Sequence, residues 1–423
     1  MDTHLADWIK DTQEGQEAES ILRNCVHCGF CTATCPTYQI LGDELDSPRG
    51  RIYLIKQVLE GKEVTRKTQI HLDRCLTCRN CESTCPSGVQ YGHLIDIGRK
   101  IVDERVERPL GERMKRESLM GLMGSKTLFN TAMGLGRAFK PLVPAGLKGK
   151  ITDKRPAGEL PKREHARKVL MLNGCVQPGM LPSIDTATAR VLDALGVQSI
   201  VAPKSGCCGA VKFHLDDQSG GLAQMRANID AWWPLIESKQ VEALVMNASG
   251  CGVTVREYAH HLKHDAQYAE RAKRVSALCM DVSEFISGFS EEALAKLRQR
   301  VEAYASRSSG ASGVPAKKLA FHPPCTLQHG QKVKGVTESL LLQLGFELTP
   351  VCDAHLCCGS AGTYSVLQPE LSEELKKRKL ENLCAGNPDK IVSSNIGCIT
   401  HLASGTDKPV LHWIEVLDGA LAG

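Results

Sequence analysis

Two copies of one cysteine motif restrict what this chain can fold into more than any other feature of its sequence. The first copy reads Cys25-Val-His-Cys28-Gly-Phe-Cys31-Thr-Ala-Thr-Cys35-Pro36. The second runs from Cys75 to Pro86, and each of its cysteines lies 50 positions after its counterpart. Thiols at i, i+3 and i+6 can surround one metal centre. The proline then turns the chain away, so the fourth cysteine points elsewhere.

This C-x2-C-x2-C-x3-C-P spacing is typical of two-cluster ferredoxins, in which the fourth cysteine of each motif ligates the other cluster. We therefore predict two [4Fe-4S] clusters, one held by Cys25, Cys28, Cys31 and Cys85 and the other by Cys75, Cys78, Cys81 and Cys35. Zinc is the alternative, because C-x2-C pairs also build zinc ribbons. Two matched quartets, each ending in Cys-Pro, favour iron.

Length and composition narrow the class of protein further. At 423 residues the chain is long enough for about three domains, so its 19 cysteines are not needed to staple a small fold. Its first residues show no secretory signal, which predicts a reducing, cytoplasmic location. No apolar run reaches membrane-spanning length. A net charge of +4 with 4% aromatic residues argues against a nucleic-acid partner.

The segment between the two motifs predicts a helix. Ser47 is a suitable N-cap, Pro48 a suitable first residue and Gly61 a suitable residue just past the end. Residues 2–22 are expected to form a further helix that leads into the first motif. Residues 1–117 are therefore predicted to form a mainly α-helical two-cluster ferredoxin domain.

Several arginines lie close to the cysteine motifs in sequence: Arg49, Arg51, Arg74 and Arg79. Such cations would raise the reduction potential of a cluster by stabilising its more negative reduced state. Solvation at the protein surface is the other explanation. The sequence favours neither.

Residues 118–165 form a basic amphipathic segment followed by a linker. Between Ser118 and Thr152 there is no acidic residue, and apolar residues recur at helical spacing. Such a segment lies on an anionic membrane surface, docks on a partner, or packs on its own protein as a connecting helix. A peripheral contact with the inner face of the cytoplasmic membrane is one outcome that this pattern predicts.

The remainder of the chain is an internal repeat, with copies at residues 166–302 and 316–423. Strand candidates at 168–172 and 243–246 return at 318–322 and 390–393, with helical segments between them. Alternating strands and helices predict two open α/β domains. We therefore expect an α/β fold class in which two repeated Cys-Cys-Gly domains follow the helical ferredoxin domain.

Each copy brings four corresponding cysteines, and three of the four pairs are 150 residues apart. They are Cys175, Cys207, Cys208 and Cys251 in the first copy, and Cys325, Cys357, Cys358 and Cys398 in the second. They fall where open α/β sheets bind ligands. Adjacent cysteines suit an opened-up cluster, or the copies pool ligands around one shared cluster. The sequence leaves open how many further Fe–S clusters they hold, while Cys279, Cys352 and Cys384 are expected to be buried thiols.

Two sets of histidines are weaker candidates. His260, His261 and His264 are expected on a surface helix, because the Glu of a zinc-binding H-E-x-x-H motif is missing. His322, His355 and His401 lie near the second group of C-terminal cysteines in sequence. They are candidates for hydrogen-bonding partners of a cluster or for proton carriers.

Several longer motifs carry a family resemblance. They are Asn24-Cys-Val-His-Cys-Gly-Phe-Cys-Thr-Ala-Thr-Cys-Pro-Thr-Tyr38, Ser47-Pro-Arg-Gly-Arg-Ile-Tyr53, Ala248-Ser-Gly-Cys-Gly252 and His355-Leu-Cys-Cys-Gly-Ser-Ala-Gly-Thr-Tyr364. In these motifs the chain resembles the iron–sulfur subunits of bacterial glycolate oxidases. More broadly, it resembles the Cys-Cys-Gly family shared with heterodisulfide reductase, lactate-utilisation proteins and the C subunit of anaerobic glycerol-3-phosphate dehydrogenase.

The resemblance implies a non-catalytic electron-transfer subunit of an oxidoreductase complex. Flavin-containing partner subunits would oxidise glycolate to glyoxylate, and this chain would relay electrons toward quinone. The sequence departs from the fullest family pattern at Ala248 and Asn395, where that pattern has the first cysteine of a terminal C-x-x-C. This departure bears on both the number and the type of C-terminal clusters.

Other functions stay open at this point. In one alternative, this chain is a catalytic subunit, and its C-terminal cysteine sites themselves reduce a disulfide or a quinone. Alternatively, the chain would relay electrons from lactate or glycerol 3-phosphate, because the substrate binds a different polypeptide. A cluster-based redox sensor without turnover is a third class of function.

Overall fold

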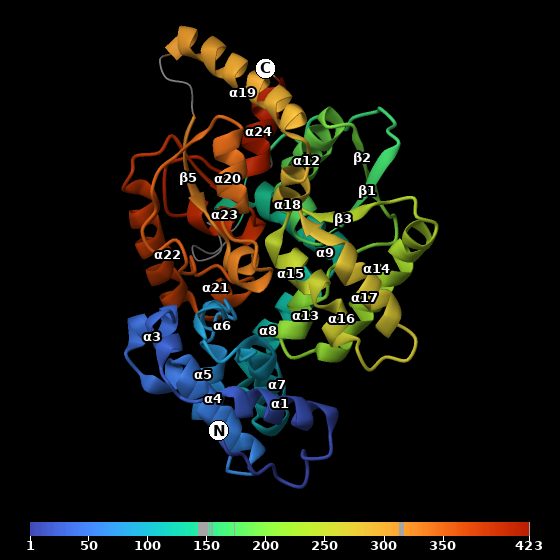
Figure 1. Cartoon of the computed structure of the whole chain (residues 1–423). Coiled ribbons are helices and arrows are strands. Elements are labelled where there is room, and N and C mark those ends of the chain that lie inside the picture. The colour runs from blue at the N-terminus through green and yellow to red at the C-terminus, as the bar shows by residue number, and fades with distance from the viewer. Residues whose placement is uncertain (143–150, 152, 154, 173, 313–316, 423) are drawn as a thin grey trace.

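The computed structural model describes residues 1–142, 151, 153, 155–172, 174–312 and 317–422. A helical N-terminal part lies at one end of the molecule, at the bottom of Figure 1, and two α/β units lie side by side above it. This arrangement confirms the predicted fold class. The domain boundaries drawn from the sequence remain predictions.

The N-terminal part consists of short helices joined by the two cysteine loops. Its elements are α1 (Gln13–Asn24), α2 (Phe30–Ala33), α3 (Pro36–Leu41), η1 (Glu44–Asp46), α4 (Pro48–Leu59), α5 (Arg66–Asp73), α6 (Asn80–Thr84) and α7 (Tyr91–Arg105). The predicted helix between the motifs is confirmed as α4, in which the Ser47 hydroxyl accepts a hydrogen bond from the Gly50 N–H. Pro36 begins α3, which turns the chain away directly after Cys35.

The helix expected within residues 2–22 begins later than predicted. Helix α1 starts at Gln13, where the Thr12 side chain caps it by accepting a hydrogen bond from the Gly15 N–H. The chain before it folds back onto the helix instead of continuing it. A Cβ atom at Gly15 would stand 2.0 Å from the Ile9 carbonyl oxygen, so only glycine permits this approach.

Two helices connect the N-terminal part to the first α/β unit. They are α8 (Leu110–Met123) and α9 (Lys126–Ala138), followed by the short η2 (Lys140–Leu142). Phe129 and Met133 of α9 are buried against the α/β core, whereas Leu128, Leu135 and Phe139 are exposed on its other side. The segment therefore packs on its own protein through one face and keeps a second apolar face open. No helix within the described ranges is long and apolar enough to cross a membrane.

The first α/β unit contains a four-stranded parallel sheet in the order β2-β1-β3-β4. Its elements are β1 (Arg167–Met171), α11 (Gln177–Met180), α12 (Ser183–Ala194), β2 (Val197–Val201), α13 (Ala210–His214), α14 (Gln218–Glu237), β3 (Ala243–Met246), α15 (Ser249–Arg256), α16 (Tyr258–His261), α17 (Ala269–Leu278), β4 (Cys279–Asp281), α18 (Val282–Ser287) and α19 (Glu291–Ser312).

The second unit repeats this topology, in the order β6-β5-β7-β8. Its elements are β5 (Lys318–His322), η3 (Thr326–Gly330), α20 (Val336–Gln343), β6 (Glu347–Leu348), α21 (Tyr364–Leu367), α22 (Pro369–Cys384), β7 (Lys390–Ser393), α23 (Ile396–Ala403), β8 (Val410–His412) and α24 (Trp413–Ala422). The four strands predicted from sequence are confirmed as β1, β3, β5 and β7. The four edge strands β2, β4, β6 and β8 were not predicted; of these, β4 and β8 are only three residues long and β6 only two.

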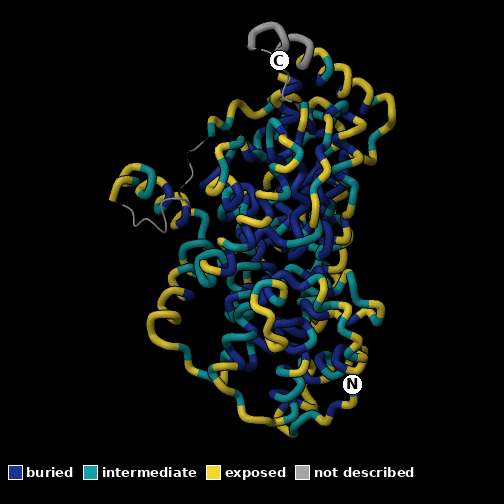
Figure 2. Tube along the Cα trace, turned by 90° about the vertical axis from the view of Figure 1, so that its left-hand side faces the viewer, coloured by how far each residue is buried: buried dark blue, intermediate teal, exposed yellow. Residues whose placement is uncertain are grey.

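One apolar core runs through both α/β units. It joins Val169 and Val191 of the first unit to Leu319, Ile391 and Trp413 of the second, all of them fully buried. Figure 2 shows buried residues through the interior and exposed residues along the outside. The two sheets are therefore held in a fixed relation, which also fixes the distance between the cysteine loops at their ends.

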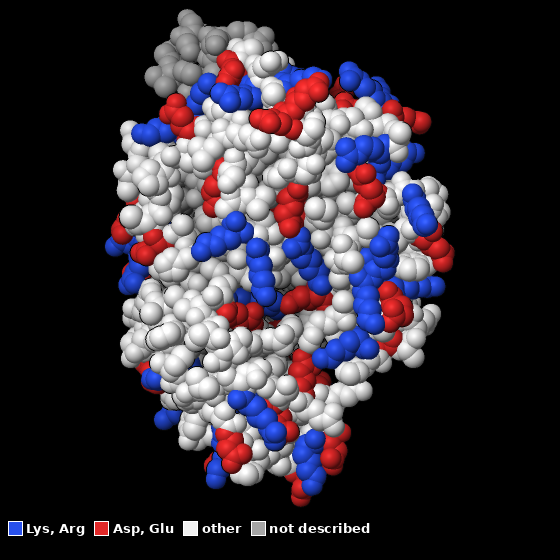
Figure 3. Space-filling view, in the orientation of Figure 1, with Lys and Arg blue, Asp and Glu red and all other residues white. Residues whose placement is uncertain are grey.

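Polar contacts attach the helical part to the first α/β unit. Arg79 pairs with Glu257, which also lies 3.2 Å from His93. Glu17 of α1 contacts Lys263 at 2.7 Å and His260 at 3.0 Å. On the face shown in Figure 3, Lys and Arg side chains are interspersed with Asp and Glu. Complementary charges rather than apolar area dominate this junction.

Candidate metal centres

The first predicted quartet is brought together by the fold. Cys25, Cys28, Cys31 and Cys85 line one hollow at the edge of the helical part, together with Tyr91. Cys28 is exposed, and its neighbours Val26 and Phe30 expose 68% and 61% of their surface. This centre therefore lies close to solvent, next to an exposed apolar patch formed by Val26 and Phe30.

The second predicted quartet lies deeper. Cys75 and Cys81 are buried, and the Cys81 thiol is close to Cys78, Cys75 and Cys35. The Tyr91 hydroxyl donates to the Cys75 sulfur at 3.6 Å. Cys35 thus lies with the cysteines of the other motif, as the crossed spacing predicts. That these residues are the ligands remains a prediction.

The backbone of each motif is shaped to turn three thiols toward one centre. His27 and Gly29 in the first loop have φ angles of 56° and 85°, and the equivalent residues Thr77 and Arg79 have 53° and 59°. Left-handed residues between successive cysteines let the loop curl around a point. The Thr77 N–H also donates to the Cys75 sulfur at 3.4 Å.

Burial makes these thiols hard to ionise by themselves. It raises the pKa of Cys31 to about 11 and raises the pKa values of Cys35 and Cys81 as well. A thiolate is poorly solvated in such a place, so a bound cation is what would stabilise it. All 19 cysteines are free thiols, so none of these sulfurs is used in a disulfide.

Two buried guanidinium groups flank the second quartet. Arg51 is almost completely buried, donates to Asp46 Oδ1 at 3.2 Å and lies near Cys35 and Cys75. Arg99, which the sequence reasoning missed, donates to the Cys75 carbonyl oxygen at 2.6 Å. Surface solvation is therefore the wrong explanation for Arg51, and also for the buried Arg79. Arg49 and Arg74 are about one-third exposed and pair with Glu44 and Asp46.

The four cysteines of the first α/β unit also converge. The Cys175 thiol donates to the Cys207 sulfur at 3.4 Å, and Cys208 contacts both Cys207 and Cys251. Hydrogen bonds from Cys175 and Cys208, with further ones from the Gly209 and Val211 N–H groups, lower the pKa of Cys207. One thiolate is thus favoured within this group even before a metal is considered.

The four cysteines of the second α/β unit form a matching group. Cys325 contacts Cys357, and Cys358 contacts both Cys357 and Cys398. Asn395, at the position where the fullest family pattern has cysteine, donates to the Cys398 sulfur at 3.6 Å. These contacts join thiols of the same copy, an arrangement that favours two separate centres over one shared cluster.

The glycine of each Cys-Cys-Gly triplet is required by close backbone packing. Gly209 and Gly359 have φ angles of 96° and 88°. A Cβ atom would stand 2.8 Å from the Gly221 carbonyl oxygen in the first case and 2.5 Å from that of Ser372 in the second. Each triplet therefore packs directly against the next long helix, α14 in the first unit and α22 in the second. This contact holds both cysteines at the end of the sheet.

A contact between sulfurs joins the helical part to the second α/β unit. The Cys325 thiol lies close to Cys78, which packs against the same apolar cluster, as well as to Cys357. Tyr364 and Leu371 pack around these thiols, and the Tyr364 hydroxyl donates to the Arg74 carbonyl oxygen at 3.1 Å. His329 reinforces the junction by accepting from Ser83 at 2.9 Å and donating to the His355 carbonyl oxygen at 2.9 Å.

A cavity of about 810 Å³ opens between the three cysteine-bearing parts. Cysteines from three of the four groups line it, and α8 and α9 add an apolar wall. The lining cysteines are Cys75, Cys78, Cys175, Cys207, Cys208, Cys251, Cys325, Cys357 and Cys398. The space is large enough for a small organic molecule.

The structure corrects several weaker expectations. His260 and His261 do not lie on a surface helix. Helix α16 is four residues long, and the His260 ring stacks on His93 with centroids 3.7 Å apart. His264 lies beyond the end of that helix. Of the three cysteines expected to be buried, Cys279 is buried, Cys384 is half-buried and Cys352 is exposed.

The histidines near the second C-terminal group differ in their surroundings. His401 is buried, and its Nε2 lies 3.2 Å from the Ser372 hydroxyl. His355 is half-exposed. His322 is completely buried beside Cys358 and Cys398. Burial lowers the pKa of its imidazole to about 3, so the ring is neutral.

A helical domain with crossed cysteine quartets, followed by two cysteine-bearing parallel sheets, defines an electron-carrying iron–sulfur protein. Comparison with family models agrees. Residues 21–89 match a 4Fe-4S dicluster domain, and residues 169–256 and 319–403 each match a cysteine-rich domain. The chain thus carries iron–sulfur clusters, and the convergence of free, buried thiols fits them.

Individual relatives identify the family more specifically than the family models do. The glycolate oxidase iron–sulfur subunit of Escherichia coli K12 is 53% identical over 100% of this chain and 99% of its own length. A probable glycolate oxidase iron–sulfur subunit of Bacillus subtilis 168 is 29% identical over 92% of this chain and 90% of its own length. Lactate utilization protein A of Geobacillus thermodenitrificans is 26% identical over 59% of this chain and 98% of its own. The chain belongs to the family of glycolate oxidase iron–sulfur subunits.

The separate C-terminal groups predict iron beyond the two ferredoxin-type clusters. After anaerobic reconstitution, we expect more than about eight iron atoms per chain. Cys208→Ala and Cys358→Ala should each remove the iron held by one α/β unit, while Cys384→Ala, outside every group, should leave the content unchanged. Iron and sulfide analysis with absorbance spectra checks this. A wild-type chain that stops at about eight iron atoms would contradict it.

Proposed function

We propose that this chain is the electron-transfer subunit of a membrane-associated glycolate oxidase. Flavin-containing partner subunits oxidise glycolate to glyoxylate, and the chain relays the electrons toward quinone. Its full-length similarity to glycolate oxidase iron–sulfur subunits supports this reading. The substrate then binds the partner, and this chain supplies no catalytic residue for the alcohol oxidation.

The observation that carries the proposal is the continuous series of thiol groups. Cys28 is exposed at one end. Cys81, assigned to the second quartet, also lines the hollow of the first. Cys78 of the second quartet contacts Cys325 of the second α/β unit. Redox centres bound at these positions would be neighbours all the way from the surface to the cavity.

In the proposed ligand sets, Cys25, Cys28, Cys31 and Cys85 hold the outer cluster and Cys75, Cys78, Cys81 and Cys35 the inner one. Cys175, Cys207, Cys208 and Cys251 hold iron in the first α/β unit, and Cys325, Cys357, Cys358 and Cys398 in the second. Clusters bound there supply one-electron transfer. Arg51 and Arg99 place positive charge beside the inner quartet, which favours its reduced state. Val26 and Phe30 provide an apolar contact for the partner next to Cys28.

Breaking the series at its outer end tests the relay. Cys28→Ser in the assembled complex should abolish reduction of the quinone acceptor, because electrons no longer enter the chain. Reduction of the partner flavin by glycolate should persist, because that step precedes the relay. Stopped-flow absorbance of the flavin and steady-state assay of a soluble quinone measure the two steps.

Cys352→Ser is the matched control, since Cys352 is equally exposed but belongs to none of the groups. It should leave both steps unchanged. Full acceptor reduction by the Cys28→Ser complex would refute the relay. Loss of flavin reduction would show instead that the residue acts in the partner.

We further propose that α9 makes a peripheral contact with the membrane. Leu128, Leu135 and Phe139 are each 56% exposed on one side of this helix, and Lys140 lies next to them. An apolar face with neighbouring cations suits the interface of an anionic bilayer. The same surface would bring the chain close to a quinone pool.

Sedimentation with phosphatidylserine-containing vesicles tests the membrane contact. Replacing Leu128, Leu135 and Phe139 together with Gln should weaken binding by about tenfold or more, because apolar area is lost from the contact. Leu160→Gln, at another exposed leucine, is the control and should not change it. Unchanged binding of the triple variant would remove the proposal.

A second candidate function is favoured by the cavity. Its apolar wall, including Leu122, Met123 and Phe129, together with the cysteines opposite, would accept a quinone ring beside the C-terminal centres. In that case the chain itself reduces the quinone.

Turnover by the chain alone tests this candidate. The reconstituted chain, given a reduced viologen as electron donor, should reduce a soluble quinone. Ala132→Trp, which places a large ring in the cavity, should slow the reaction at least severalfold. Thr131→Trp on the exposed side of α9 should not. Absence of turnover by the wild-type chain would exclude the candidate.

A further inference from the structure

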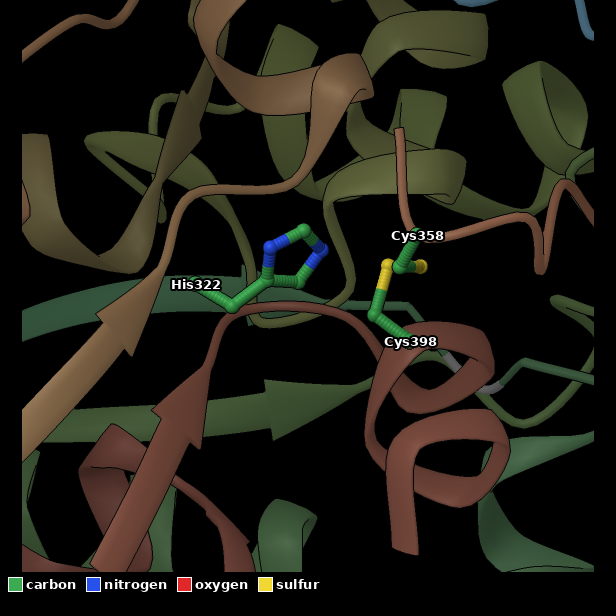
Figure 4. Close-up of side chains that lie close together, drawn as sticks. All are labelled: His322, Cys358 and Cys398. Atoms are coloured by element: carbon green, nitrogen blue, oxygen red, sulfur yellow. The ribbon is translucent and has the colours of Figure 1, made fainter. Parts of the chain in front are cut away.

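His322 lies where β5 ends and leads into the loop of Cys325. Its side chain is completely buried, and neither ring nitrogen has a hydrogen-bond partner. One ring nitrogen and the sulfurs of Cys358 and Cys398 all lie within 4.8 Å of one another. Figure 4 shows the imidazole beside the two thiols, with the Cys398 sulfur nearer to the ring in this view. The three groups come from three separate segments of the second α/β unit.

A buried imidazole whose ring nitrogens have no hydrogen-bond partner destabilises the folded state. A buried polar group without a partner forfeits the hydrogen bonds that it makes in water. Strand β5 holds the residue in place, since the Ser393 hydroxyl donates to the His322 carbonyl oxygen at 2.8 Å. Two prolines follow, which stiffen the connection to Cys325. A cation between the ring and the sulfurs would use the nitrogen lone pair and remove the cost.

We propose that His322 is a nitrogen ligand to the iron bound by Cys358 and Cys398, so that the cluster of the second α/β unit has mixed sulfur and nitrogen ligation. This rests on the proposed function, because it takes the four cysteines of that unit as cluster ligands. Asn395 does not compete for the position, because its side chain donates to the Cys398 sulfur and accepts from the Gly250 N–H.

The internal repeat shows that the two copies differ here. The residue 150 positions before His322 is Leu172, which cannot bind a metal. The first α/β unit therefore has no imidazole at the corresponding place. Both units bring four cysteines, so a neutral imidazole would add a further ligand to the second centre without adding negative charge.

Nitrogen ligation has a direct spectroscopic signature. In the reconstituted, reduced full-length chain, pulsed electron paramagnetic resonance should detect a nitrogen coupled to one cluster. The coupling should change when histidine is selectively labelled with nitrogen-15. This measurement needs no substitution, so it does not depend on whether a variant folds. A wild-type spectrum without histidine coupling would overturn the proposal.

The His322→Leu substitution introduces the residue type that the first unit has at the equivalent position. It tests whether the nitrogen coupling comes from His322. The coupling should disappear, and the midpoint potential of one cluster should change, because one ligand of its iron is lost. His412→Leu is the matched control, because His412 is equally buried at the end of β8 in the same sheet and is not grouped with the cysteines. It should leave both readouts unchanged. Persistence of the coupling in His322→Leu would assign it to another histidine and overturn the proposal.

The iron content separates this inference from the proposed function. If Cys358→Ala loses iron but no nitrogen coupling is found, the cysteine ligands stand and His322 is not a ligand. If the wild-type unit holds zinc instead of iron, the cluster assignment itself fails, and the mixed-ligand cluster fails with it.

Discussion

Burial of closely spaced thiols is the constraint on which the rest of this structure depends. A buried thiol resists ionisation, as the raised pKa values of Cys31 and Cys81 show, yet iron binds the thiolate. The fold meets this requirement with left-handed loop residues such as Thr77, which aim thiols at one point. It also places buried guanidinium groups, such as Arg51, beside them. In the inner quartet, neighbouring positive charge thus favours the thiolate form that iron binds.

The arrangement of the three parts follows from the same requirement. Ion pairs such as Arg79–Glu257 attach the helical part to the first α/β unit. Thiol and aromatic contacts around Cys325 attach it to the second. The apolar core shared by the two sheets keeps these two junctions in a fixed position relative to each other. An outer centre near solvent, an inner centre and two centres around a cavity then form a series, which suits a protein that passes electrons between partners.

Much of the local structure could be predicted from sequence. The caps of α4 and the four main strands follow from short-range rules that each segment satisfies by itself. Errors arose where long-range packing decided the outcome. Helix α1 begins only at Gln13 because the preceding chain folds back onto Gly15. His260 is half-buried on an apparently polar helix because another domain covers it.

The sequence by itself determined which residues form each metal-binding motif, because spacing along a chain limits which thiols can reach a common centre. It also determined the repeat, and with it the parallel sheets. Only the tertiary structure decided how the centres are connected. The contact between Cys78 and Cys325, the burial of Arg99 and the approach of His322 to Cys358 all join segments far apart in sequence. No local pattern encodes such contacts, because they depend on how whole domains pack.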